Sequence, residues 1–357
     1  MPNPTIAAGY PKAFLEFAVS KGADRQTLIE RSHICPDDLQ NQDNRIPLAN
    51  YLALLKAGIE LCDNPALSLL FGEAVKLQDI SLIGLIGVAF DNVESMRRQV
   101  NRYAPLTLDA DDGGTADAAE FARENGEVWL KSTSEIYKAN PLLTEAAFAR
   151  SVCDARALQA SLSASMPGLA KLTFPKAIRF THQEPSYRAE YDRIFGVPLF
   201  FGSDMNALLV DEAILNLKLP RTNPYLAEVM SARAEELLKS LEKSKTMRGR
   251  VESLLIPILH TGEASMDMIS VKLGFSRQTL FRQLKAEGVT FEEVLDELRQ
   301  GLALHYLGEK KVPVNETAYL LGFSEPAAFS RAFKRWTGSS PRTYASRCSS
   351  STKQADA

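Results

Sequence analysis

The residues with the clearest chemical potential form an internal repeat near the end of the 357-residue chain. The sequence Leu-Gly-Phe-Ser occurs at residues 273–276 and again at residues 321–324. A helical pattern precedes and follows each copy, and the second helix carries arginine and lysine at matching offsets. Two helices joined by a sharp turn can place the second helix in a DNA major groove. The repeat therefore predicts two helix-turn-helix units, at about residues 266–286 and 315–337.

The turn inside each unit explains why the same residue types recur. A glycine can take the left-handed conformation that ends the first helix. The phenylalanine that follows is expected to fill the wedge between the two helices, and the serine hydroxyl is expected to cap the second helix. These turn and cap residues are Gly274, Phe275 and Ser276 in the first unit and Gly322, Phe323 and Ser324 in the second.

A third helix is predicted between the two units. Thr290 and Glu293 have the spacing of a capping box, in which each side chain bonds the other residue's backbone N–H. Apolar residues then form one stripe: Phe291, Val294, Leu295, Leu298, Leu302 and Tyr306. A helix over residues 291–307 is about 25 Å long at a rise of 1.5 Å per residue. With the units at its ends, it can set two recognition helices roughly one DNA turn, about 34 Å, apart.

Residues 250–345 resemble the DNA-binding domain of the AraC/XylS family of transcription regulators. The phrases that carry the resemblance are LGFSRQTLFRQLKAEG and TAYLLGFSEPAAFSRAFKRWTGSSPRTY. The second phrase ends in the closing motif of the family, which consists here of Gly338, Ser340, Pro341 and Tyr344. The chain departs from the family at Ala345, where an arginine is common, and this puts one phosphate contact in doubt. The resemblance implies sequence-specific binding of double-stranded DNA and regulation of transcription.

The second helix of each unit supplies the candidate DNA contacts. Arginine and glutamine can each make two hydrogen bonds to a purine edge, and an exposed phenylalanine can touch a thymine methyl. In the first unit, the residues expected to face the bases are Arg277, Gln278, Phe281 and Arg282, of which the resemblance assigns base reading to the last three. The matching face of the second unit carries Ala327, Ser330 and Arg331. Phosphate contacts are expected from Lys285, Lys334, Arg335 and Arg342. For each of these cations, the alternative is a solvated surface charge.

The distribution of charge along the chain agrees with this interpretation. The whole chain has a formal net charge of -3. Residues 1–244 hold 25 Lys and Arg against 32 Asp and Glu, whereas residues 245–347 hold 15 against 11. An acidic body followed by a mildly basic module is typical of a chain that binds a polyanion through its C-terminal part.

The front two-thirds of the chain is interpreted as a mixed region. Helical periodicity extends to about residue 104, and strand-like alternation with a turn at 111–114 follows. Later helices are expected at 142–162 and 187–195, and strands at 128–130, 178–181, 198–201 and 208–210. The expected fold class is mixed: an α+β N-terminal sensor/dimerisation domain, and an all-α C-terminal domain with two helix-turn-helix units joined by a linker helix.

Four segments follow from these patterns. They are an effector-binding and dimerisation domain at residues 1–217, a linker and connecting helix at 218–244, the DNA-binding domain at 245–347 and a disordered polar tail at 348–357. Residues 10–215 resemble the arabinose-binding-like sensor found in one branch of the same family. The matching phrases include RIPLANYLALLKAGIELCDNPALSLLFGEAV and IRFTHQEPSYRAEYDRIFGVPLFFGSDMNALLV.

Three hypotheses remain open for this front region. It binds a small effector that changes DNA binding, it only dimerises, or it is an enzyme fused to a DNA reader. His182 is a candidate ligand contact, with the alternative that it satisfies its neighbours' hydrogen bonds at a strand end. The sequence has no Gly-rich phosphate loop, no nucleophile elbow and no metal-ligand spacing, so we expect no enzyme, no cofactor and no metal.

The expected partners are double-stranded DNA, a small-molecule effector, a second copy of the chain and RNA polymerase. No membrane is expected, because the longest uncharged apolar stretch, residues 80–90, is too short to span one. The N-terminus lacks the basic start and apolar run of a signal peptide, so a cytoplasmic location is expected. The four cysteines are dispersed along the chain and predict no disulfide framework.

Overall fold

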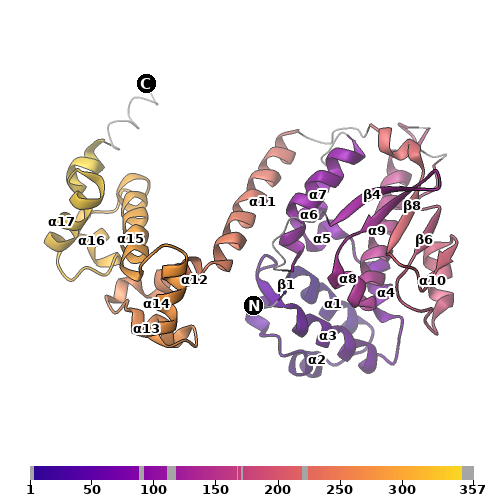
Figure 1. The fold of residues 1–357 in the computed structure, drawn as a ribbon, viewed down its shortest axis with the longest axis horizontal. Coiled ribbons are helices and arrows are strands. Elements are labelled where there is room, and N and C mark those ends of the chain that lie inside the picture. The colour runs from indigo at the N-terminus through magenta and orange to yellow at the C-terminus, as the bar shows by residue number, and fades with distance from the viewer. Residues whose placement is uncertain are drawn as a thin grey trace. The chain divides into compact units, whose positions relative to one another are not determined.

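A computed structural model describes residues 4–87, 92–110, 118–166, 168–169, 172–218 and 224–347 (Figure 1). The chain divides into two compact units, Met1–Leu238, here the front unit, and Lys239–Ala357, here the rear unit. The turn expected at 111–114, residues 219–223 of the predicted linker and the tail predicted at 348–357 lie outside the described residues.

The front unit begins with a helical layer beside a small sheet. Its helices are α1 (Gly9–Ser20), α2 (Arg25–Ser32), the 3-10 helix η1 (Pro36–Leu39), α3 (Leu48–Leu61), α4 (Leu67–Ala74), α5 (Leu77–Ile80), α6 (Leu82–Gly87) and α7 (Val93–Thr107). The antiparallel sheet has the order β2-β1-β3 and consists of β1 (Thr5–Ala7), β2 (Arg45–Pro47) and β3 (Leu108–Asp109). The rings of Phe14 and Phe71 meet edge to face in the core of this layer, with centroids 5.2 Å apart.

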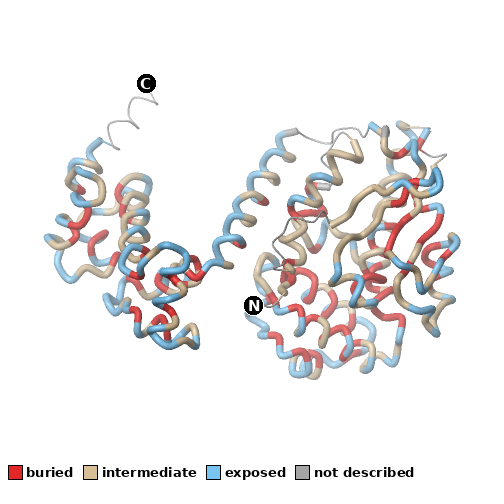
Figure 2. Tube along the Cα trace, viewed as in Figure 1, coloured by how far each residue is buried: buried red, intermediate tan, exposed pale blue. Residues whose placement is uncertain are grey.

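A larger sheet follows, with the strand order β4-β5-β8-β6-β7. Its strands are β4 (Ala119–Glu124), β5 (Glu127–Ser132), β6 (Ala177–Arg179), β7 (Leu199–Phe200) and β8 (Ala207–Val210). The pairs are antiparallel except β6 with β7, which run parallel because a helix connects them. Figure 2 shows β6 and β8 as largely buried segments of this sheet.

Helices cover one face of the larger sheet. The helices of this region are α8 (Glu135–Ala139), α9 (Pro141–Leu162), α10 (Arg188–Phe195) and the 3-10 helix η3 (Glu212–Asn216). Val152 of α9 and Phe195 of α10 share one apolar cluster with Ile178 and Leu208 of the sheet. The front unit is therefore a mixed α and β structure, and the predicted fold class is confirmed.

The rear unit is helical throughout described residues 239–347. Helix α11 (Pro224–Lys245) runs across the division between the units. It is followed by α12 (Met247–Leu255), the 3-10 helix η4 (Ile256–Thr261), α13 (Met266–Lys272), α14 (Arg277–Ala286), α15 (Phe291–Gly308), α16 (Val314–Leu320) and α17 (Pro326–Thr337). Residues 341–347 form a last helical stretch.

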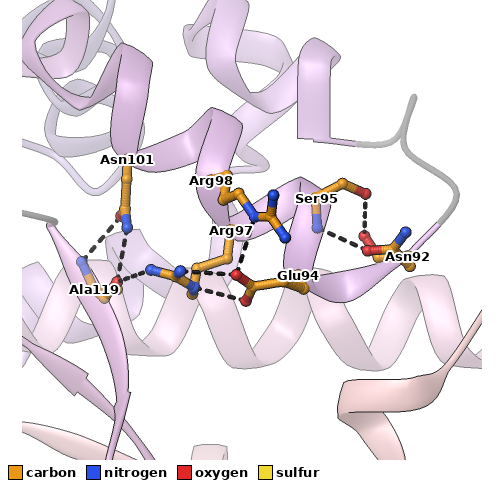
Figure 3. Close-up of polar contacts among 7 residues, drawn as sticks. All are labelled: Asn92, Glu94, Ser95, Arg97, Arg98, Asn101 and Ala119. Atoms are coloured by element: carbon orange, nitrogen blue, oxygen red, sulfur yellow. Dashed lines mark hydrogen bonds and ion pairs between the residues drawn. The ribbon is translucent and has the colours of Figure 1, made fainter.

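Helix α7 is tied to the edge strand β4 by polar side chains (Figure 3). Asn101 donates to the backbone oxygen of Ala119 at 2.8 Å and accepts from the backbone nitrogen of the same residue at 3.1 Å. Arg97 donates to the same oxygen at 3.1 Å and also pairs with Glu94. An edge strand has backbone groups without strand partners, and here two side chains from one helix satisfy the first of them.

We predict that Asn101→Ala lowers the free energy of unfolding of the front unit by about 1–2 kcal/mol, because it removes two backbone-directed hydrogen bonds. Hydrogen-exchange mass spectrometry in increasing urea measures this from peptides of β4 and β5. The matched control is Arg98→Ala on the same helix, which removes only an ion pair from a largely exposed arginine and should cost less than about 0.5 kcal/mol. Equal losses for the two variants would contradict the prediction.

Candidate nucleic-acid interface

The first helix-turn-helix unit consists of α13 and α14. Gly274, just after α13, has a φ of +72°, in the left-handed region. Phe275 packs against the core of this unit, with the guanidinium of Arg250 5.6 Å from its ring centroid. The hydroxyl of Ser276 accepts from the backbone nitrogen of Thr279 at 3.1 Å and so caps α14. The chain therefore reverses within four residues between the two helices.

The second unit consists of α16 and α17 and has a similar turn. Gly322 has a φ of +74°. Phe323 lies against Phe329 and Trp336 of α17, with ring centroids 5.6 and 6.2 Å apart. The guanidinium of Arg299, from α15, lies 4.8 Å from the Phe323 centroid and donates to the backbone oxygen of Leu321 at 3.0 Å.

The expected cap at Ser324 is wrong. Helix α17 begins at Pro326, its N-cap position is Glu325, and that residue makes no side-chain cap bond. The second copy has one residue more than the first between the serine and the helix, which moves the helix start beyond Ser324. Proline at the first helical position has no N–H to be capped, and its fixed φ favours the start of a helix there.

The exposed face of α14 carries the predicted base-reading residues of the first unit. Leu280 and Leu284 are buried on the opposite face. Gln278, Phe281, Arg282 and Lys285 are all exposed on the outer face. Phe281 is 49% exposed, and the ammonium of Lys285 lies 6.0 Å from its ring centroid. This arrangement leaves a large apolar ring and several hydrogen-bonding side chains together on one side of the helix.

Arg277 lies at the first turn of α14 and pairs with Asp267 of α13 at 2.9 Å. Both side chains are more than half exposed, so the pair adds little stability. Arg277 could therefore leave Asp267 for a phosphate oxygen at little cost in free energy.

The outer face of α17 is different in character. Ala327, Arg331 and Lys334 are exposed there, whereas Phe329 and Phe333 are fully buried on the inner face. The half-buried Ser330 donates its hydroxyl to the backbone oxygen of Pro326 at 2.9 Å. Arg335 pairs with Asp296 of α15 at 2.5 Å, and the exposed Arg342 lies in the helical stretch 341–347.

Comparison with known proteins places this geometry in a family. Residues 22–219, more than half of the chain, match the family described as the N-terminal arabinose-binding domain of AraC transcription regulators. The chain belongs to the AraC family of transcription regulators. Residues 269–347 match a helix-turn-helix domain family, and this range covers the second unit and all but the first three residues of the first.

The chain is also similar to transcription regulators of similar length. The ornithine utilization regulator of Pseudomonas aeruginosa is 26% identical over 341 residues, which are 95% of this chain and 96% of that protein. The HTH-type transcriptional regulator VirS of Mycobacterium tuberculosis is 24% identical over 331 residues, 90% of this chain and 91% of that one. The crystal structure of transcriptional regulator CdpR from Pseudomonas aeruginosa covers 90% of this chain and 96% of its own, at 19% identity and a TM-score of 0.36. This AraC-family chain is a DNA-binding transcription regulator.

The role of Arg299 was not predicted from the sequence. This half-buried residue joins α15 to the turn of the second unit through the Phe323 ring and the Leu321 carbonyl. Burial lowers the pKa of its guanidinium. In the sequence, Arg299 resembles any polar residue of α15. The one signal is its position next to Leu298 and three residues before Leu302, which places it at the edge of the apolar stripe.

His182, the candidate ligand contact of the front unit, lies just beyond the end of β6. Its Nε2 is 3.1 Å from the hydroxyl oxygen of Tyr191. Its Nδ1 is buried and has no hydrogen-bond partner among the described residues. One ring nitrogen of His182 therefore has a protein partner, as expected if the residue satisfies its neighbours' hydrogen bonds. Among the described residues, the other ring nitrogen has none.

None of the helices in the described residues has the length and apolar character needed to cross a membrane. In the same ranges, no three His, Cys, Asp or Glu side chains are grouped so that they could hold a metal ion.

We predict that Gly322→Ala destabilises the rear unit more than Gly274→Ala. Alanine in the left-handed region costs about 1–2 kcal/mol at either site. At Gly322, the added Cβ would also lie 2.1 Å from the backbone oxygen of Leu259, whereas at Gly274 it meets open space. Relief of that clash requires backbone movement and adds about 1–3 kcal/mol. Hydrogen-exchange mass spectrometry of α14 and α17 peptides measures both losses. A Gly274→Ala variant as damaged as Gly322→Ala would refute the difference.

Proposed function

We propose that one rear unit reads two successive major-groove segments, with α14 in the first and α17 in the second. The observation that supports this most is the presence of two helix-turn-helix units packed at opposite ends of α15. Phe291 and Val294 belong to the core of the first unit, and Ala303 and Leu307 to the core of the second. Helix α15 has 18 residues and is about 27 Å long, so with a unit at each end it can set two recognition helices roughly one DNA turn, about 34 Å, apart.

The two units are proposed to divide the work unequally. Gln278 and Arg282 have long side chains that can each bond a base edge at two points. The matching positions of α17 carry the short Ala327 and Ser330, and the Ser330 hydroxyl is already used on its own helix. The first unit therefore supplies most of the base preference. Arg331 is the residue of α17 that can add to it, while Lys285, Lys334, Arg335 and Arg342 contact phosphates.

We predict that Arg282→Ala costs about 1–3 kcal/mol of binding free energy and relaxes base preference at one or two positions. Lys334→Ala should weaken binding to all sequences alike and reduce the salt slope by about one. Binding-site selection, followed by titrations at several salt concentrations, measures both effects.

The matched control for these variants is Lys310→Ala, an exposed lysine just after α15 with no assigned DNA contact. It should change neither base preference nor salt slope. Unchanged preference in Arg282→Ala together with altered preference in Lys334→Ala would reverse the two roles. A selected site with one short box and no second segment about one helical turn away would overturn the two-segment proposal itself.

The front unit is proposed to bind a small-molecule effector that controls DNA binding. Its match to an arabinose-binding domain family supports this, and the full-length relative from Pseudomonas aeruginosa is named as a regulator of the utilization of a small metabolite, ornithine. We also propose that residues 1–217 dimerise the chain, that 218–244 connect it to the DNA-binding residues 245–347, and that RNA polymerase is a partner. A front unit that only dimerises is the second candidate, and a fused enzyme is the third.

Two measurements on the full chain test the front unit. We predict that a metabolite screen will contain a compound that raises the melting temperature, because a ligand that binds only the folded state stabilises it. Sedimentation at tens of micromolar should give a dimer, since paired modules gain affinity on neighbouring sites. A dimer with no stabilising compound would favour the dimerisation-only candidate, turnover of a compound would favour the enzyme, and a monomer would refute the dimer.

A further inference from the structure

A polar cluster lies buried in the front unit, between α9, α10 and the end of β6. Glu145, on α9, is only 1% exposed. The hydroxyls of Tyr187 and Tyr191 both donate to its Oε2, at 2.9 and 2.7 Å. The Tyr191 hydroxyl also lies 3.1 Å from Nε2 of His182. Two segments far apart in sequence, α9 and the residues 182–191 that follow β6, thus meet in one hydrogen-bonded cluster.

The hydrogen bonds of this cluster can be assigned atom by atom. When Glu145 is ionised, the single hydroxyl proton of Tyr191 is donated to it, and Nε2 of His182 then carries the proton that joins it to Tyr191. Nδ1 of His182 is then an acceptor. Among the described residues, neither this Nδ1 nor Oε1 of Glu145 has a hydrogen-bond partner, and both atoms are buried. The two unfilled acceptors therefore belong to the two side chains that the Tyr191 hydroxyl joins.

The charges of the cluster favour a cation. Burial raises the pKa of Glu145 to about 7 and lowers the pKa of His182 to about 4, so the imidazole is neutral near pH 7. Within the described ranges, no lysine or arginine forms an ion pair with Glu145. A buried carboxylate without a cationic partner costs stability, and a positively charged donor would offset that cost.

Aromatic rings extend the cluster on the side of His182. The ring of Phe180 lies 5.0 Å from His182, 5.3 Å from Tyr191 and 5.3 Å from Phe201, measured between centroids. Ring faces attract cations. The guanidinium of Arg188 already lies 5.2 Å from the Phe201 centroid. An aromatic wall next to unfilled acceptors is the chemistry that holds an amine or a guanidinium.

One side of the cluster is formed by a segment without regular secondary structure. His182 and Tyr187 belong to residues 181–187, which have no helix or strand and join β6 to α10. Both side chains are half-buried, whereas Glu145 and Tyr191 are fully buried. His182 and Tyr187 are therefore the members of the cluster that are nearest to solvent.

We propose that Glu145, His182 and Tyr191 form the recognition site for a small cationic effector that carries a primary amine or a guanidinium. Its N–H groups donate to Glu145 Oε1 and His182 Nδ1, and its charge offsets that of the carboxylate. This inference rests on the proposed effector control of the front unit and names the chemical class of the effector.

The first test compares charged probes with neutral ones on the full chain. The probes are agmatine, 1,4-diaminobutane and 2-phenylethylamine. The neutral match of the first two is 1,4-butanediol, which has the same four-carbon chain, and that of the third is 2-phenylethanol. At least one amine should raise the melting temperature and bind in calorimetry, while its neutral match should bind at least tenfold more weakly. Equal binding of the matched pair, or no binding of any amine, overturns the proposal.

The second test uses a matched pair of variants. Glu145→Gln keeps the size of the side chain but removes the charge, and it should weaken binding of the active amine at least tenfold. Glu184→Gln changes an exposed carboxylate of the same segment and should leave the affinity within about twofold, as for an exposed charge screened by water. Similar affinities of wild type and Glu145→Gln overturn the site.

A third readout needs no variant. Glu145 must be ionised to hold the amine, and its pKa of about 7 makes the ionised fraction rise from pH 6 to pH 8. Affinity should increase about tenfold over that range. The facing groups do not titrate there, because burial raises the pKa values of Tyr187 and Tyr191 and lowers that of His182 to about 4. Affinity that is flat with pH overturns the role of the carboxylate.

The measurements separate an error in the amine site from an error in the proposed effector control. If a neutral or anionic metabolite raises the melting temperature and no amine does, the amine site is wrong and effector control stands. If no compound of any class stabilises the chain, both are wrong. DNA binding by the rear unit is measured separately and is affected by neither result.

Discussion

Both helix-turn-helix units depend on one helix, α15, whose two ends are buried in different cores. Phe291 and Val294 belong to the first core and Ala303 and Leu307 to the second, while Leu295 packs against both. A helix turns 100° and rises 1.5 Å with every residue. Any change in the length of α15 would therefore rotate one unit against the other. The spacing of the units is set by a rigid helix rather than by a loop, and this is what two recognition helices on one face of DNA require.

The two units differ in packing and in side chains around the same turn. The first unit has an open space beside Gly274 and long polar side chains on α14, whereas the second unit has no space beside Gly322 and short side chains on α17. Arg299 and the aromatic residues around Phe323 add further packing to the second turn. The second turn is therefore more tightly packed than the first, which agrees with the proposed role of the first unit as the main reader of bases.

Local patterns in the sequence were enough to predict the parts of the fold that are held together locally. The capping box of Thr290 and Glu293 is confirmed, because its bonds join residues three positions apart. The cap at Ser324 failed for a local reason as well, since one inserted residue and Pro326 moved the helix start. The cluster around Glu145 could not be predicted in this way. Its partners Tyr187 and Tyr191 lie 42 and 46 residues away, and the carboxyl looks like an ordinary acid near the start of a helix.

Buried polar groups that lack partners destabilise a fold, so their presence in the front unit needs a physical reason. A ligand that fills them gains the hydrogen bonds and also removes the cost of leaving them unfilled. The ligand gains these hydrogen bonds only in a conformation that holds the cluster together. It therefore binds that conformation more tightly than others, and this difference in affinity shifts the conformational equilibrium. Helix α11 is held on the front unit by residues 234 and 235. It places Ala234 in a buried cluster with Ile86 of α6 and Tyr103 of α7, pairs Glu235 with Arg102 at 2.8 Å, and continues without a break to Lys245. The front unit therefore fixes the middle of a helix whose last residues belong to the rear unit.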